Sequence, residues 1–160
     1  MALVPLLATA PAWAATLVNT FNDWTLYSNA AGSQICFLAA APSATEPAGL
    51  KRDPALLYIS TWPKDGVKAE ISVKLGFPAR KTTEPVLTIS GAVTGAFKLF
   101  VKDDRAYVAD ATQELKLLEA MKKGSKLTVQ ATSERGTSVS DTYSLQGITN
   151  ALQALAGGCP

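Results

Sequence analysis

The sequence predicts a mainly β protein, a single antiparallel β-sandwich or jelly-roll-like domain with two short helices near the C-terminus. The strongest observation is the stretch 67–77, where every second residue is apolar and the residues between are mostly Lys, Glu and Ser. Other short apolar segments alternate with turns rich in Gly, Pro and Asp, which gives about eight strands in all. Helical spacing of apolar residues occurs only after residue 109. A strongly bent half-barrel is the alternative arrangement of the same strands.

The beginning of the chain is typical of an exported bacterial protein. Residues 1–14 are apolar and end in small residues, with Ala12 and Ala14 at the positions that signal peptidase requires. Cleavage is predicted after Ala14, with Ala15 as the alternative. No Lys or Arg precedes the apolar run, which is consistent with a start further upstream. The run is also too short for a permanent membrane span of about 20 residues. We therefore expect a signal peptide at 1–14 and a mature domain at 15–160, in the periplasm or secreted.

The first part of the mature domain predicts a hairpin, a loop and a further strand. The segments 24–27 and 35–38 are short and apolar, and the residues between them, 28–33, have the composition of a loop. The stretch 42–54 contains Pro, Gly and charged residues and is expected to be an exposed irregular loop. The segment 56–62 is rich in β-branched and aromatic residues, and a Pro and an Asp-Gly turn follow it, so it predicts a strand.

The stretch 67–77 predicts an amphipathic strand with one buried and one wet face. The expected core face carries Val67, Ala69, Ile71, Val73, Leu75 and Phe77, and the expected solvent face carries Lys68, Glu70, Ser72 and Lys74. Three more strands are expected at 86–90, 97–101 and 106–109.

A helix is predicted to begin after Asp110, whose side chain suits the N-cap position, with Gln113 as its capping-box partner. Leu117 and Met121 lie on its apolar face. Gly124 is expected to end the helix, after two lysines that suit its negative C-terminal dipole.

A hairpin and a second helix are expected to complete the domain. The segments 127–131 and 137–143 alternate around the turn 133–136. Ser144 is expected to cap the final helix, which ends at the glycines 157–158. The apolar stripe of that helix consists of Leu145, Ile148, Leu152 and Leu155.

The two cysteines, Cys36 and Cys159, lie near opposite ends of the expected mature chain. Disulfides form and persist in the compartments that exported proteins reach, so we predict that the two are bonded. Two free buried thiols are the alternative. A metal site is less favoured, because two Cys without any His supply too few ligands.

Charge and composition exclude several classes of function. The net charge is +2, from 15 basic and 13 acidic residues without long charged runs, so nothing indicates a nucleic-acid partner. The chain has no His, which removes the ordinary Ser-His-Asp, Cys-His and His-ligated metal sites. No Cys-x-x-Cys spacing and no phosphate-binding glycine loop is present. We therefore predict no catalytic, cofactor or metal site.

Carboxylates are the remaining candidates for catalysis, since paired acids can hydrolyse glycosides. The candidate acids are Asp53, Glu70, Asp103 and Asp104. Asp103 and Asp104 are expected in a hairpin turn, where Asp is a common turn former. A cofactor-free hydrolase is therefore an alternative function and not the expected one.

A candidate binding edge comprises Arg52 and Asp53, at the end of the long loop, together with Tyr58 and Trp62 on the strand that follows. Loops on a rigid scaffold often carry function. The alternative interpretation is a structural ion pair that fixes the loop, with the aromatic residues buried or half-buried in the fold.

Short motifs in a particular order extend over nearly the whole mature chain. In the first half they are Asn22-Asp-Trp24, Cys36, Arg52-Asp-Pro54, Tyr58-Ile-Ser60, Trp62-Pro63 and Glu70-Ile-Ser-Val73. In the second half they are 97–101, Glu119-Ala-Met-Lys-Lys-Gly124-Ser125, Thr132-Ser-Glu-Arg-Gly-Thr137, Asp141-Thr-Tyr-Ser-Leu-Gln-Gly147 and Cys159. Their order resembles that of the invasion-associated locus B family of exported bacterial proteins. The resemblance implies an envelope location and a β-sandwich-like fold, and it supplies no catalytic or ligand-binding residues.

The function expected from the sequence is that of a non-enzymatic exported accessory protein that acts by binding. Its partner is an unidentified protein or small ligand, and the family name suggests envelope function or host-cell interaction. A small-ligand carrier is a further alternative, which predicts an apolar cavity of about 300–1,000 Å³ between the sheets.

Overall fold

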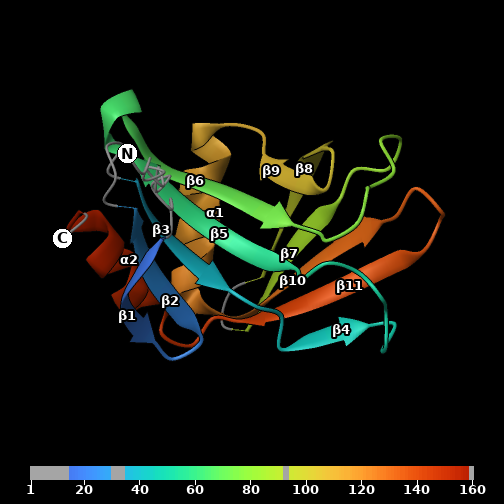
Figure 1. The fold of residues 1–160 in the computed structure, drawn as a ribbon, viewed down its shortest axis with the longest axis horizontal. Coiled ribbons are helices and arrows are strands. Elements are labelled where there is room, and N and C mark those ends of the chain that lie inside the picture. The colour runs from blue at the N-terminus through green and yellow to red at the C-terminus, as the bar shows by residue number, and fades with distance from the viewer. Residues whose placement is uncertain (1–14, 30–34, 92–93, 159–160) are drawn as a thin grey trace, which may run out of the picture.

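The computed structural model describes residues 15–29, 35–91 and 94–158. It confirms a mainly β, antiparallel fold with two α-helices among these residues (Figure 1). The first six strands are β1 (Thr16–Phe21), β2 (Trp24–Asn29), β3 (Ile35–Ala40), β4 (Ala44–Glu46), β5 (Leu56–Trp62) and β6 (Val67–Lys74). The others are β7 (Val86–Gly91), β8 (Gly95–Lys102), β9 (Arg105–Val108), β10 (Gly124–Thr132) and β11 (Ser138–Ser144). A short 3₁₀ turn (Pro63–Asp65) and the helices α1 (Ala111–Lys123) and α2 (Ile148–Ala156) complete the described elements.

The strands of the described residues form one continuous sheet in the order β1-β2-β3-β5-β6-β9-β8-β7-β10-β11-β4. Strand β8 joins two half-sheets, because its beginning pairs with β7 and its end pairs with β9. We call β1, β2, β3, β5, β6 and β9 the first half-sheet and β7, β10, β11 and β4 the second. Side chains of both half-sheets belong to one hydrophobic core. The two layers of the fold are therefore halves of a single bent sheet.

The helices cover different parts of the core (Figure 1). Helix α1 contacts strands of both half-sheets, and its Leu117 and Met121 are fully buried. Its predicted N-cap is confirmed, since the Gln113 amide donates to Asp110 Oδ1 at 2.9 Å. Helix α2 packs against β1, β2 and β3 through Ile148 and Leu155. Neither α-helix in the described part of the chain has the length and apolarity that a membrane-spanning helix needs.

The predicted hairpins are confirmed, but two edge strands were not predicted. β1 lies at one edge of the sheet, is largely exposed and is interrupted by a bulge between Leu17 and Asn19. β4 forms the other edge, where 44–46 pairs with 140–142 of β11. The prediction of an irregular loop over 42–54 was therefore wrong at β4. The sequence did not predict these two strands, because an edge strand has little buried surface and so lacks strong apolar alternation.

The two helix ends differ in part from the predictions. Gly124 ends α1 as predicted, but in an extended conformation (φ −86°, ψ 173°) that leads directly into β10. A Cβ there would lie 2.4 Å from Ile89 Cγ2, so close packing accounts for the glycine. The predicted start of the second helix was wrong, because α2 begins after Gly147, which has a positive φ of 85°. Ser144 instead accepts a hydrogen bond from the Gln146 amide at 3.2 Å.

The amphipathic pattern of 67–77 is only partly confirmed. Ile71, Val73 and Leu75 are buried as predicted, but the strand ends at Lys74. Ser72, which was predicted to face solvent, is only 4% exposed. It lies directly between Tyr58 of β5 and Tyr107 of β9 on the outer side of the sheet. The outer side of the first half-sheet is therefore covered by aromatic side chains.

Candidate binding face

The structure places the four residues of the candidate binding edge in two separate regions. Arg52 and Asp53 line a pocket of about 570 Å³ beside the β10–β11 turn. Tyr58 and Trp62 line a second pocket of about 410 Å³ on the outer side of the first half-sheet. The two regions differ in how far the fold already satisfies their polar groups.

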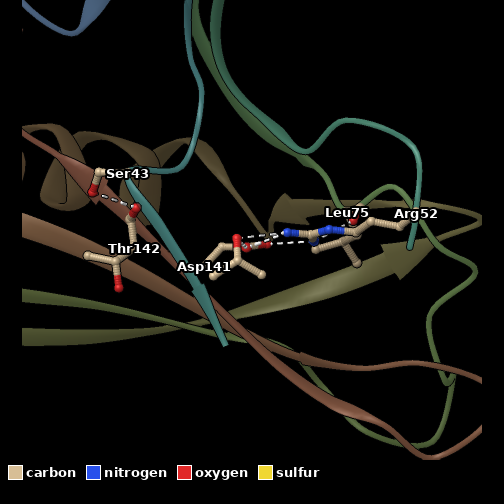
Figure 2. A network of polar contacts seen from close by, with 6 residues as sticks. Ser43, Arg52, Leu75, Asp141 and Thr142 are labelled. Atoms are coloured by element: carbon tan, nitrogen blue, oxygen red, sulfur yellow. Dashed lines mark hydrogen bonds and ion pairs between the residues drawn. The ribbon is translucent and has the colours of Figure 1, made fainter. Parts of the chain in front are cut away.

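Arg52 is the centre of a buried polar network (Figure 2). Its Nη1 donates to Asp141 Oδ2 at 2.7 Å and to the Leu75 carbonyl at 2.8 Å. Its Nη2 donates to Asp141 Oδ1 and, at 3.2 Å, to Thr45 Oγ1. The side chains of Arg52 and Asp141 are only 9% and 2% exposed. This paired arrangement is the charge-assisted, two-point contact that arginine and carboxylate favour.

The network connects segments that are distant in the sequence. Thr45 Oγ1 also donates to Asp141 Oδ1 at 2.7 Å, which joins β4 to β11. Leu75 follows β6, so the same guanidinium joins the first half-sheet to the second. Asp53 is not the partner of Arg52. It is exposed, and its amide donates to the Gly76 carbonyl at 3.2 Å. The Nη donors of Arg52 are thus all used within the fold, which identifies a structural ion pair.

Aromatic residues form a continuous row across the outer side of the first half-sheet. Tyr27 and Phe37 stack with ring centroids 5.2 Å apart, and Phe37 meets Tyr58 edge-on at 5.9 Å. Tyr107 stacks on Phe100 at 5.4 Å. The strand register places Ser72 between the two groups of rings. These rings, together with Ser72 between them and Leu17 beside Tyr27, form one set of outward-facing positions that we call the aromatic row. Its members are Leu17, Tyr27, Phe37, Tyr58, Ser72, Tyr107 and Phe100.

The two ends of the aromatic row are exposed. Leu17 on β1 is 57% exposed and Phe100 on β8 is 49% exposed, and these are two of the three large apolar side chains that are most accessible among the described residues. The third, Leu115, lies on α1. Two of these three side chains thus lie on the outer side of the sheet, at opposite ends of the row.

A row of cations lies directly beside the aromatic row. Lys74 of β6 is paired in register with Arg105 of β9, which is in turn paired with Lys102 of β8. The guanidinium of Arg105 lies over the Tyr58 ring, 5.3 Å from its centroid. None of these three cations forms a salt bridge with another described residue. Like charges directly opposite one another destabilise a sheet, and the contact of Arg105 with the Tyr58 ring acts against that repulsion.

Two further polar groups of this region are notable. The indole Nε1 of Trp62 is buried and donates to no other described group, although Trp62 lines the 410 Å³ pocket. Glu114 Oε1, from α1, accepts the Ile71 amide of β6 at 3.1 Å. Burial raises the pKa of Glu114, and the nearby Glu70 and Asp110 charges add to that effect, against the lowering by the Ile71 hydrogen bond.

The four candidate catalytic acids do not meet in one site. Asp53 lines the 570 Å³ pocket, and Glu70 lines the 410 Å³ pocket. Asp103 and Asp104 lie in the β8–β9 turn, where their backbone carbonyls accept amides of the 75–79 connection. The described residues contain no group of three or more His, Cys, Asp or Glu side chains that could hold a metal ion.

Two predictions concern residues outside the described part. Cys36 is fully buried on β3, but Cys159 lies outside the described residues. The disulfide between them therefore stays a prediction. The expected signal peptide, residues 1–14, also lies outside them.

Sequence reasoning identified Arg52, Tyr58 and Trp62 but missed Asp141 and Arg105. Asp141 is 89 positions from Arg52 along the chain, so no local pattern connects the two residues. Arg105 was assigned only to a turn. The one local signal for it was the alternation of Arg105 and Tyr107 on one side of a short strand.

Comparisons with known proteins agree with this architecture. The family model described as Invasion associated locus B (IalB) protein matches residues 24–156. The crystal structure of invasion associated protein b from Bartonella henselae is similar with a TM-score of 0.64 and 16% sequence identity, over 89% of this chain and 97% of that chain. At this identity the structural match supports the fold alone. No curated protein sequence matches the chain.

Proposed function

Because the chain belongs to the invasion-associated locus B family, we propose that it is an exported, non-enzymatic accessory protein that acts by binding a partner. The partner docks on the face formed by the aromatic row and the basic row. The location is the periplasm or the outside of the cell, after removal of residues 1–14.

One observation carries the proposal. Aromatic rings and a cation lie on the outer side of the first half-sheet and not in the hydrophobic core. Tyr, Trp, Phe and Arg are the residues enriched at the centres of protein interfaces. Here Tyr58, Tyr107 and Arg105 lie within the face, and Lys74 and Lys102 flank Arg105. A centre of rings and arginine with a charged rim is the usual composition of a binding surface.

The non-enzymatic part of the proposal is supported by residue chemistry. The chain contains no His, and the four candidate acids lie in different regions. General acid-base work requires groups within hydrogen-bonding reach of a common substrate atom. We therefore favour recognition over turnover.

The solved relative is named an invasion associated protein. On that basis we propose that the partner is a protein of the bacterial envelope or of a host-cell surface. The proposal takes from the relative's name only this general setting.

The test is crosslinking capture of partners by the purified protein, comparing Tyr107→Ala with the wild type. The matched control is Leu115→Ala, which removes an exposed apolar side chain from α1. We expect Tyr107→Ala to lose the captured partners and Leu115→Ala to keep them. Thermal melts check that both variants are folded. Equal capture by all three proteins would overturn the proposal.

A second candidate function is small-ligand carriage. The 570 Å³ pocket has a volume in the usual range for ligand sites, but it lies beside the β10–β11 turn and differs from the apolar cavity between the sheets that a carrier predicts. Charged residues, among them Lys51, Glu134 and Arg135, line this pocket beside the apolar Phe77. Native mass spectrometry of the protein purified from its source tests this function. A bound small molecule of constant mass would support carriage, and its absence would leave only the binding face.

A further inference from the structure

We infer that the partner of the binding face is a protein surface with acidic side chains, placed to meet the row Lys74, Arg105 and Lys102. This inference rests on the proposed function, because it specifies the chemistry of the partner on the same face. It follows from the charges, the ring geometry and the spacing of the exposed apolar groups.

The charge of the face is unbalanced. The outward positions of β6, of β9 and of the end of β8 that pairs with β9 carry four cations, Lys68, Lys74, Lys102 and Arg105, and one acid, Glu70. Two further acids, Asp103 and Asp104, lie in the turn that connects Lys102 to Arg105, and neither forms a salt bridge with a described residue. The face therefore attracts negative charge although the whole chain is nearly neutral.

The register sets the geometry of the complementary charges. Lys74, Arg105 and Lys102 occupy directly opposed positions on three neighbouring strands. Neighbouring strands lie about 4.8 Å apart, so the row extends over about 10 Å. Two or three carboxylates within such a length would relieve the repulsion between the cations. An acidic partner thus removes a cost that the free protein carries.

Charge also argues against a second copy of this chain as the occupant. A symmetric dimer places the same patch of each subunit against the other. On this face the basic rows would then oppose each other, which is a repulsive arrangement. The face is better suited to a partner of opposite charge.

Ring geometry argues against a sugar or a single-stranded nucleic acid, which stack on open ring faces. Tyr27 and Phe37 turn ring faces toward each other, and so do Tyr107 and Phe100. Arg105 lies over Tyr58. Each stacked ring therefore has one face covered by its neighbour, which leaves less open ring face for a sugar or a base and suits the mixed side chains of a protein surface.

The spacing of exposed apolar groups argues against a lipid bilayer. Leu17 and Phe100 lie six strand intervals apart in the sheet order, roughly 30 Å at about 4.8 Å per strand. The residues between them are half-buried or buried. Two isolated apolar side chains make a poor membrane anchor, since interfacial binding scales with buried apolar area.

The experiment measures binding of the purified protein to four probes. These are a random copolymer of Glu and Tyr, a copolymer of Lys and Tyr, phosphatidylglycerol vesicles and a single-stranded oligothymidine. Three variants are compared with the wild type. The double variant Lys74→Glu with Lys102→Glu reverses the basic row, and Lys81→Glu with Lys116→Glu makes the same change of net charge at exposed lysines elsewhere. Tyr107→Ala disrupts the aromatic row.

We expect the protein to bind the Glu and Tyr copolymer and not the other three probes. Reversal of the basic row should weaken that binding by about tenfold, and the control double variant should not change it. Rising salt should weaken it as well, because exposed charges are screened. Preference for vesicles or oligothymidine, or equal binding by the two double variants, would overturn the inference.

The same variants separate this inference from the proposed function. If Tyr107→Ala loses the crosslinked partners but reversal of the basic row keeps them, the binding face stands and the acidic partner is wrong. If both variants keep the partners, the binding face and the acidic partner are both wrong.

Discussion

Two arginines of this protein lie over aromatic rings, and their surroundings are opposite in kind. Arg52 lies 5.8 Å from the Phe77 ring centroid, and its Nη atoms donate hydrogen bonds to Asp141, Thr45 and a backbone carbonyl. Arg105 lies 5.3 Å from the Tyr58 ring centroid, between two lysines and without an acidic partner among the described residues. The first arginine has all its Nη donors paired within the fold, whereas the second has a ring contact but no salt bridge among the described residues.

This difference shows which property separates a structural charge from a recognition charge. Ring contact is a similar signal at the two positions, so it does not distinguish them. The distinguishing property is whether opposite charge and acceptors within the fold already meet the guanidinium. A buried pair is costly to break, because the remaining partner is left as an uncompensated charge. An exposed cation without a partner can be changed at little cost to stability.

The largest expected effect is therefore at the buried pair. Arg52→Ala should lower the free energy of unfolding by about 3–5 kcal/mol, because it leaves the Asp141 carboxylate buried without its partner. Arg52→Lys should recover only part of the loss, since a lysine cannot make the two-point contact. Denaturant unfolding measures both. The double variant Arg52→Ala with Asp141→Asn should lose clearly less free energy of unfolding than the sum of the losses in the two single variants. Additive losses would contradict a direct pair.

The predicted disulfide should have the next largest effect. Replacing Cys36 and Cys159 by Ser should lower the free energy of unfolding by about 2–4 kcal/mol, because a long loop in the unfolded chain is released. Cys36 is fully buried on β3, which helix α2 contacts, so we expect the bond to affect stability and not binding. Thiol counting in the denatured, unreduced protein checks the bond. Two titratable thiols would refute it.

Most of the first half-sheet could be predicted from the sequence, because its strands are buried on one side. Burial imposes alternation of period two, which β5 shows over its whole length and β6 shows only in part, because Ser72 is also buried. The edge strands β1 and β4 lack that constraint, since their stability comes from backbone pairing with β2 and β11. A backbone hydrogen bond leaves no mark on side-chain composition, so no local pattern predicted these two strands.

The candidate site was predictable only where a local motif marked it. Arg52 stood out because charged residues end a long loop, but its partner is on β11 and only the fold brings the two together. The sequence did not predict the basic row, for a similar reason. Lys74, Lys102 and Arg105 are near neighbours only after β6, β9 and β8 pair in their observed register. Register between strands is a property of the whole sheet.

A smaller effect on stability is expected at the second arginine. Arg105→Ala should change the free energy of unfolding by at most about 2 kcal/mol, because a half-buried cation over a ring contributes less than a buried, hydrogen-bonded ion pair. It could even stabilise the protein by relieving repulsion from Lys74 and Lys102. Denaturant unfolding of Arg105→Ala beside Arg52→Ala tests the comparison directly. A loss at Arg105 as large as that at Arg52 would mean that both arginines are structural.

The smallest effect on stability is expected at Glu114. This half-buried carboxylate forms no salt bridge with another described residue, but it accepts a hydrogen bond. Its carboxylate accepts the Ile71 amide at 3.1 Å beyond the end of the β6–β9 pairing, so it covers a backbone donor at that edge of β6. Burial raises its pKa above the ordinary value of 4.5. The folded state therefore holds this proton more tightly than the unfolded state does. The resulting contribution to stability is present below the ordinary pKa and is lost as the pH rises through the raised pKa.

Glu114→Gln keeps an oxygen that accepts the Ile71 amide and removes the titration. Relative to the wild type, the variant should therefore gain stability as the pH rises from the ordinary pKa of 4.5 through the raised pKa, by less than about 1 kcal/mol because the group is partly solvated. Glu119→Gln is the matched control on the same helix. The Lys122 ammonium, which donates to Glu119 at 2.7 Å, lowers the pKa of Glu119, so this change should lose relative stability as the pH rises from the lowered pKa to the ordinary value of 4.5. Denaturant unfolding at several pH values measures both slopes. Parallel slopes for the two variants would show that burial does not set the ionisation of Glu114.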